Sequence, residues 1–156
     1  MNQELGRVEV EFAFNQVTQA VRGEIMKALD VLAEFDSGDG RLISDIHCAI
    51  TRDKPRSYEV GIVARRFVEH VVDGMLSPQS TKDVNLMRKI ESLSNLKVAP
   101  WVVSYMHLIR IVGNEGAHER ARDRTPPHLI GSDLSMCLFA LLRILEFWNA
   151  RPKPLH

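Results

Sequence analysis

Residues 57–76 read SYEVGIVARRFVEHVVDGML and carry the clearest helical pattern in the chain. Apolar side chains recur there at steps of three and four residues, at Val60, Val63, Ala64, Phe67, Val68, Val71, Val72, Met75 and Leu76. Because an α-helix turns once in about 3.6 residues, side chains with this spacing line one face. The stretch therefore predicts a helix that buries one face in a hydrophobic core.

The same spacing extends toward both ends of the chain. It predicts further helices over residues 3–35, 41–51, 80–96, 101–118 and 132–149, with little strict alternation of apolar and polar residues. Ser80 and Asp83 have the spacing of a capping box, which places the start of the fourth helix at Ser80. A polar, proline-containing loop is expected over residues 119–131. Helices with short connections predict an all-α, up-and-down bundle of five to six helices with a long first helix.

The long first helix carries an apolar stripe over most of its length. The members of the stripe are Val10, Phe14, Val17, Val21, Ile25, Ala28, Leu32 and Phe35. Such a stripe is typical of a helix that faces a core, and we expect it to pack on the bundle. A seam between two copies of the chain is the alternative explanation.

The chain has the length and composition of one globular domain. It contains 156 residues, of which 45% are hydrophobic and 26% charged, and we expect one domain over residues 1–151 and a tail at 152–156. No stretch approaches the roughly 18 consecutive apolar residues of a membrane helix, and the first residues lack a signal-peptide pattern. We therefore expect a cytoplasmic location. Cys48 and Cys137 fit no metal or redox spacing and are predicted to be buried thiols.

The formal net charge is zero, but the charges are unevenly distributed. Residues 1–40 contain three basic and eight acidic side chains, so residues 41–156 contain 17 basic and 12 acidic ones. This asymmetry fits a surface that binds an anion, or an acidic helix that lies across basic helices within the fold. In the predicted loop, Arg120, Arg122 and Arg124 are candidates for contacts with an RNA backbone, and a solvated loop is the alternative.

Three polar residues of different chemistry follow one another along the helix predicted over 101–118. Arg110, Asn114 and His118 are spaced four residues apart, and at about 100° per residue their side chains fall within roughly 80° of one another. Each residue also has a purely structural explanation. Arg110 could pair with Glu69 or Asp73, Asn114 could bind a nearby backbone group, and His118 could stabilise the helix C-terminus. Their common strip makes a binding or catalytic site the competing explanation.

Gly113 and Gly116 lie in the same segment, and each costs about 1 kcal/mol relative to alanine inside a helix. Something in the structure should offset this cost. Three explanations are compatible with the sequence: another helix or a second subunit packs closely on Gly113, Gly116 and Ala117, a ligand needs access, or the helix ends near Gly116.

The sequence contains no recognisable metal or cofactor motif. The histidines His47, His70, His107 and His128 form no convincing set of metal ligands. No glycine-rich phosphate-binding loop is present, and the serine and cysteine residues lack the surroundings of a nucleophile. We therefore expect neither a metal nor an organic cofactor.

The segment from Arg110 to His118 has the pattern Arg-x-x-Gly-Asn-x-x-Ala-His. This pattern resembles the signature helix of the HEPN (higher eukaryotes and prokaryotes nucleotide-binding) superfamily. It is most similar to a bacterial branch classed as a domain of unknown function, which recurs as an accessory domain in restriction and defence proteins. The resemblance extends to residues 64–69, residues 86–93 and the closing helix from Ser132, and covers about residues 41–150.

The resemblance implies an activity and a role for each residue of the strip. Catalytic HEPN proteins are metal-independent ribonucleases whose arginine and histidine meet those of a second subunit at a symmetric interface. His118 would then act as general acid or base on the RNA. Arg110 would hold the scissile phosphate, and Asn114 would orient the phosphate or the imidazole. The segment from Gly113 to His118 would lie near the twofold axis of a homodimer.

The spacing departs from that of the catalytic members. Seven residues separate Arg110 from His118, more than in the ribonucleases of the superfamily, and each extra residue rotates a side chain by about 100°. We therefore expect a noncatalytic HEPN-like module of a bacterial defence or toxin–antitoxin system, which dimerises and binds RNA, a nucleotide or a protein partner from the same operon. A metal-independent endoribonuclease that uses Arg110, Asn114 and His118 across the dimer interface is the alternative.

Overall fold

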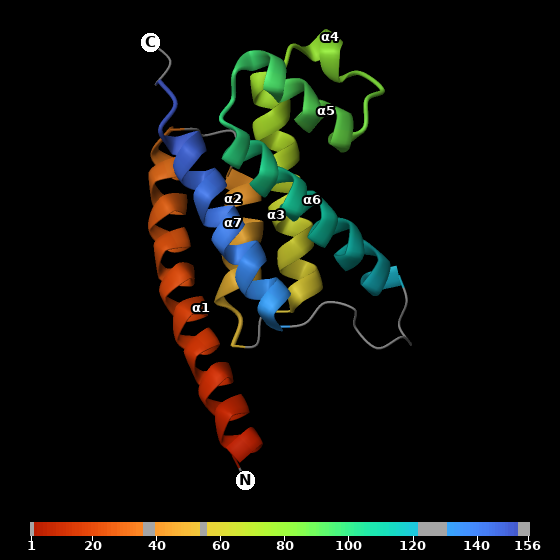
Figure 1. Ribbon diagram of the computed structural model, residues 1–156. Coiled ribbons are helices and arrows are strands. Elements are labelled where there is room, and N and C mark those ends of the chain that lie inside the picture. The colour runs from red at the N-terminus through yellow and green to blue at the C-terminus, as the bar shows by residue number, and fades with distance from the viewer. Residues whose placement is uncertain (1, 36–39, 54–55, 122–130, 153–156) are drawn as a thin grey trace.

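A computed structural model describes residues 2–35, 40–53, 56–121 and 131–152, and for residues 2–15, 35, 57, 118–121 and 131 it describes only the backbone. Every regular element among these residues is a helix (Figure 1). In chain order they are α1 (Asn2–Phe35), α2 (Gly40–Thr51), α3 (Ser57–Met75), α4 (Pro78–Thr81), α5 (Leu86–Ser92), the 3-10 helix η2 (Leu93–Leu96), α6 (Pro100–Ala121) and α7 (Gly131–Asn149). The predicted all-α class is confirmed, although the helices are slightly more numerous than the five to six expected.

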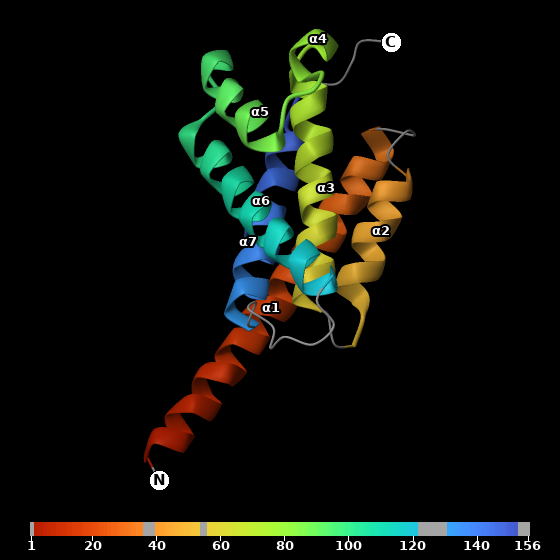
Figure 2. The same ribbon diagram turned by 90° about the vertical axis from the view of Figure 1, so that its right-hand side faces the viewer.

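Helix α3 is the centre of the bundle. It packs against α2, α6 and α7, and α1 lies alongside α7 (Figures 1 and 2). The predicted apolar face of α3 is buried at Val60, Ala64, Phe67, Val68, Val71 and Val72. Removing a side chain of this kind from water contributes about 1.5–3 kcal/mol, so this face is a main source of stability. Within the described residues, no helix combines the length and apolarity needed to cross a bilayer.

Helix α1 is longer than the bundle on which it packs. It has 34 residues, α7 has 19, and the N-terminal part of α1 projects beyond the other helices (Figures 1 and 2). The predicted stripe is buried at Ile25, Ala28 and Leu32. Val17 is 56% exposed, so the prediction of a continuous core stripe is wrong there, because none of the described helices buries that side chain. The side chains of Val10, Phe14 and Phe35 lie outside the described residues.

The predicted start of the helix after α3 is wrong. Pro78 opens the single turn α4, and Asp83 has a φ of 57°, a left-handed conformation that cannot continue an α-helix. Helix α5 begins only after Asn85, whose side-chain oxygen accepts a hydrogen bond from the backbone N–H of Arg88 at 3.0 Å. Asn85 is therefore the N-cap that the sequence analysis had assigned to Ser80.

The two cysteines occupy different environments. Cys137 is buried in α7, and burial raises the pKa of its thiol to about 12. Cys48 is exposed on α2, so the prediction that both thiols are buried is wrong for Cys48. The two thiols should therefore differ strongly in their reactivity toward alkylating reagents.

Candidate functional site

Helices α3 and α6 cross in backbone contact at the glycines. A Cβ added to Gly113 would lie 2.6 Å from the Cβ of Arg65 and 2.8 Å from the carbonyl oxygen of Gly61. A Cβ added to Gly116 would lie 2.8 Å from the carbonyl oxygen of Tyr58. Both distances are shorter than van der Waals contact, so only glycine fits at these positions. Close packing within the chain therefore accounts for both glycines, and α6 continues past Gly116 to Ala121.

Arg110 lies half-buried on α6, where its Nε donates a hydrogen bond to Nδ1 of His107 at 3.4 Å. This distance is long for a hydrogen bond, so the contact orients the guanidinium only weakly. Partial burial, followed by the positive charge of Arg110, lowers the pKa of His107, against an opposing effect of Glu91. A neutral imidazole at neutral pH keeps the lone pair that accepts this bond.

The carboxylates considered as partners of Arg110 bind other side chains. Glu69 pairs with Arg65 at 3.3 Å, and Asp73 pairs with Lys89 at 2.8 Å. Arg110 forms no ion pair with any carboxylate in the part of the chain that the structure describes. The alternative in which Arg110 pairs with Glu69 or Asp73 is therefore not what the described residues show, and no described carboxylate neutralises its charge.

The other two members of the predicted strip follow Arg110 on α6. Asn114 is half-buried, one turn further along the helix, and His118 lies one turn beyond Asn114 with only its backbone described. Helix α6 is unbroken through this segment, so the helical spacing holds the three residues on one strip. Ala117, beside His118, is exposed. The side chain of Arg120 lies outside the described residues, as do Arg122 and Arg124 altogether.

A cleft of about 240 Å³ lies between α3 and α6, next to this strip. It is lined by Ile62, Arg65, Arg66, Glu69, Gly113 and Ala117. Gly113 and Ala117 flank Asn114 on α6, so the cleft and the strip are neighbours on the helix surface. The Nε of Arg65 is buried and has no hydrogen-bond partner among the described residues. The cleft therefore contains a buried donor that a bound anion would satisfy.

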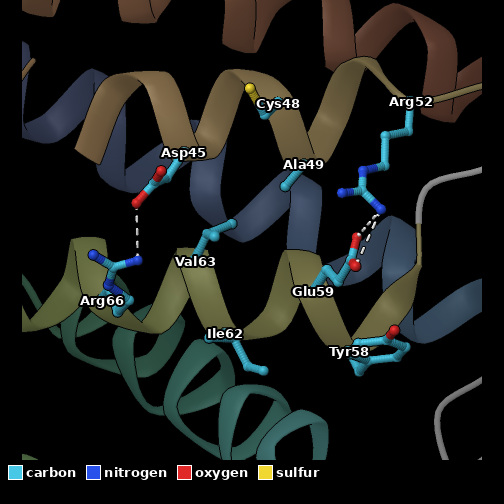
Figure 3. A pocket seen from close by; sticks show the side chains of 9 residues that line it. All are labelled: Asp45, Cys48, Ala49, Arg52, Tyr58, Glu59, Ile62, Val63 and Arg66. Carbon is cyan, nitrogen blue, oxygen red and sulfur yellow. Dashed lines mark hydrogen bonds and ion pairs between the residues drawn. The ribbon is translucent and has the colours of Figure 1, made fainter. Parts of the chain in front are cut away.

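A second cleft, of about 530 Å³, lies between α2 and α3 (Figure 3). One ion pair stands at each end: Arg66 and Asp45 at 3.0 Å, and Arg52 and Glu59 at 2.9 Å. Ala49 and Val63 lie between these pairs, and Cys48 lies at the rim. This cleft was not predicted from the sequence. The sequence pattern that accompanies it is a pair of opposite charges seven residues apart at each helix, Asp45 on α2 with Arg52 just after its end, and Glu59 with Arg66 on α3.

The ionisable groups do not form a metal site in the described residues. No three histidine, cysteine, aspartate or glutamate side chains come together there in a group that could hold a metal ion.

Comparison with known proteins places the chain in a family but assigns no activity. No curated protein and no solved structure matches the chain. The sequence profile of a family described as a domain of unknown function, DUF4145, matches residues 49–141. The matched residues run from the end of α2 into α7 and include α3 and α6, the two helices that line the smaller cleft. Because this match covers more than half of the sequence, the chain belongs to the DUF4145 family.

Proposed function

We propose that residues 1–151 form a noncatalytic, HEPN-like module that binds a phosphate-bearing ligand, RNA or a nucleotide, on the strip of Arg110, Asn114 and His118. The module would serve a bacterial defence or toxin–antitoxin system, as the resemblance of its signature helix implies. The observation that carries the proposal is the guanidinium of Arg110, which is half-buried on α6 and forms no ion pair with a described carboxylate.

The cleft beside the strip supports this ligand class. Arg65 and Arg66 line it, and their positive charges stand next to the glycine-rich surface of α6. A phosphate binds arginine through two parallel N–H groups, which gives direction as well as energy. The buried Nε of Arg65 would gain the acceptor that it lacks among the described residues.

The continuity of α6 favours binding over catalysis. A break near Gly113 or Gly116 would have allowed the long spacing between Arg110 and His118 to be absorbed, but α6 runs unbroken from Pro100 to Ala121. Each residue by which the Arg110–His118 spacing exceeds that of the ribonucleases therefore turns His118 by about 100° around the axis of α6 relative to Arg110. The second candidate function is a metal-independent endoribonuclease, which the shared strip of Arg110, Asn114 and His118 favours.

Self-association through the outer face of α6 is part of the proposal. Ile111 is 51% exposed and stands next to the strip on the helix surface. Gly113 and Gly116 are covered by α3, so a second copy would meet Ile111 and Ala117 instead. We expect light scattering to detect a dimer at micromolar concentration and Ile111→Glu to convert it to a monomer. A wild-type chain that is monomeric under these conditions would remove this part of the proposal.

The binding function is tested with an end-labelled RNA pool in excess EDTA. We expect the wild type to bind without cleaving, and Arg110→Ala to weaken binding by about tenfold or more, because a charged hydrogen bond contributes about 1.5–3 kcal/mol. Arg88→Ala removes the same charge from the exposed surface of α5 and should leave binding unchanged. Equal affinities of Arg110→Ala and wild type would refute the proposal. Cleavage that disappears in His118→Ala would establish the endoribonuclease instead.

A further inference from the structure

The two clefts are parts of one surface trough that crosses α3. Ile62 and Arg66 line both clefts. Val63 points between α2 and α3, whereas Ile62 points to the side of α3 on which α6 lies (Figure 3). A ligand that is held beside α6 can therefore reach across Ile62 into the larger cleft without leaving the surface.

One buried polar atom of the trough has no hydrogen-bond partner among the described residues. This atom is a donor, the Nε of Arg65. Nη1 of Arg52 contacts both oxygens of the Glu59 carboxylate, Oε1 at 3.1 Å and Oε2 at 2.9 Å, and each of these oxygens keeps a second lone pair that can accept a hydrogen bond. Because buried polar groups in proteins are nearly always satisfied, the Nε of Arg65 indicates a ligand with an acceptor at that end of the trough, and the Glu59 carboxylate offers an acceptor to the ligand's other end.

The charge balance of the trough favours a ligand with few phosphates. Arg52, Arg65 and Arg66 are matched by Asp45, Glu59 and Glu69. A long polyanion would meet as many negative as positive side chains. A single phosphate needs only Arg65 and Arg66, and it can take Arg66 from Asp45 at small cost, because an exposed ion pair contributes about 0–1 kcal/mol.

The larger cleft suits an aromatic base. Its volume of about 530 Å³ lies within the range of roughly 300–1,000 Å³ for small-molecule sites. Ala49 and Val63 give it an apolar floor, and Tyr58 and Arg52 stand at the same end as Glu59, where each could stack on a ring (Figure 3). Glu59 and Arg66 are seven residues apart, roughly 10 Å along α3, which is comparable with the length of an extended nucleotide.

We propose that the α2–α3 cleft is a base-reading pocket, in which Glu59 accepts a hydrogen bond from an amino group of guanine, adenine or cytosine while Arg65 and Arg66 hold the phosphate of the same nucleotide. Uracil is discriminated against, because its N–H stands between two carbonyl oxygens that the carboxylate repels. The inference rests on the proposed function, since it names the ligand of the same site. A free nucleotide and the end of an RNA strand share this chemistry.

Calorimetric titration with the four ribonucleoside monophosphates tests the pocket. We expect the three amino-bearing bases to bind at least about tenfold more tightly than uridine monophosphate, in line with the discrimination of a specific base contact. Glu59→Gln should abolish this preference, and Glu146→Gln, on the outer face of α7, should preserve it. Equal affinity for all four nucleotides, or an unchanged preference in Glu59→Gln, would overturn the inference. A trinucleotide added in parallel distinguishes an RNA end from a free nucleotide.

Arg110→Ala separates this inference from the proposed function. If both hold, the variant weakens all four nucleotides and keeps the base preference. If the wild type prefers amino-bearing bases but Arg110→Ala leaves every nucleotide affinity unchanged, the function of the strip is refuted and the pocket is supported. If Arg110→Ala weakens nucleotide binding but the wild type shows no base preference, the pocket alone is refuted. If no nucleotide binds to the wild type, the pocket is refuted, and the RNA-pool experiment alone decides whether the strip binds RNA.

Cys48 provides a second readout on the unmodified protein. Cys48 is exposed and is one of the residues that line the larger cleft, whereas Cys137 is buried. We expect guanosine monophosphate to slow the alkylation of Cys48 by a bulky maleimide severalfold, and uridine monophosphate at the same concentration to have little effect. Equal protection by both nucleotides, or protection by neither, would contradict a base that occupies the cleft.

Discussion

The two sides of α3 are built in opposite ways. Toward α6, the helices are in backbone contact through Gly61, Gly113 and Gly116, with no room for a methyl group at Gly113. Toward α2, the helices stand apart and leave a cleft of about 530 Å³, closed at its ends by the ion pairs of Arg66 and Arg52. One side therefore stabilises the fold and positions the α6 strip, and the other leaves a surface that a ligand can occupy.

The largest effect is expected where the backbones touch. Gly113→Val would force carbon atoms into the Cβ of Arg65 and the carbonyl of Gly61, so we expect a loss of about 3 kcal/mol in the free energy of unfolding. Gly23→Ala is the matched control, because Gly23 lies inside α1 with nothing within 4 Å of an added Cβ. That substitution should stabilise the protein by about 0.5–1 kcal/mol. Urea denaturation measures both, and a neutral Gly113→Val would refute the close packing.

A smaller effect is expected from acid at the contact between His107 and Arg110. The folded protein lowers the pKa of His107 below its ordinary value of 6.5, so the unfolded chain binds the proton more readily. Stability is then full above pH 6.5 and is lost as the pH falls through the pKa of the folded state. We expect His107→Gln to reduce this part of the pH dependence, measured as denaturation midpoints across that range. An identical pH profile in His107→Gln would contradict the effect.

The smallest effect is expected on the open side of α3. Asp45→Asn breaks an ion pair in which both side chains are more than a third exposed, so we expect a change of less than about 1 kcal/mol. The same variant frees Arg66 and should strengthen phosphate binding. A loss of stability comparable with that of Gly113→Val would mean that the α2 side also holds the fold together. Urea denaturation and a phosphate titration, run on the same sample, distinguish these outcomes.

The sequence predicted well what depends on helical period and local chemistry. Helices α2, α3 and α7 begin and end within one or two residues of the predicted bounds, and Pro100 opens α6 as expected. The start of α5 was missed because two N-cap candidates, Ser80 and Asn85, lie close together, and the left-handed backbone at Asp83 decides between them. Spacing alone carries no information on that conformation.

Features that depend on contacts between helices distant in the chain could not be predicted from the sequence. The glycines of α6 signalled a close approach, but only the fold identifies Tyr58 and Gly61 as its partners. The α2–α3 cleft depends on Asp45 meeting Arg66, 21 residues away, and neither residue is unusual by itself. The exposure of Val17 depends on which side of α1 the other described helices cover, and the apolar spacing within α1 does not determine that side.

The most direct test of the account is an NMR titration of isotope-labelled protein with guanosine monophosphate. We expect backbone signals to shift along the trough and the strip, from Asp45 and Glu59 through Arg66 to Asn114. The aromatic face formed by α6 and α7, where Trp101 and Phe139 are exposed, should not respond. Shifts confined to that aromatic face, or a spectrum unchanged at saturating nucleotide, would contradict the division of α3 into a packing side and a binding side.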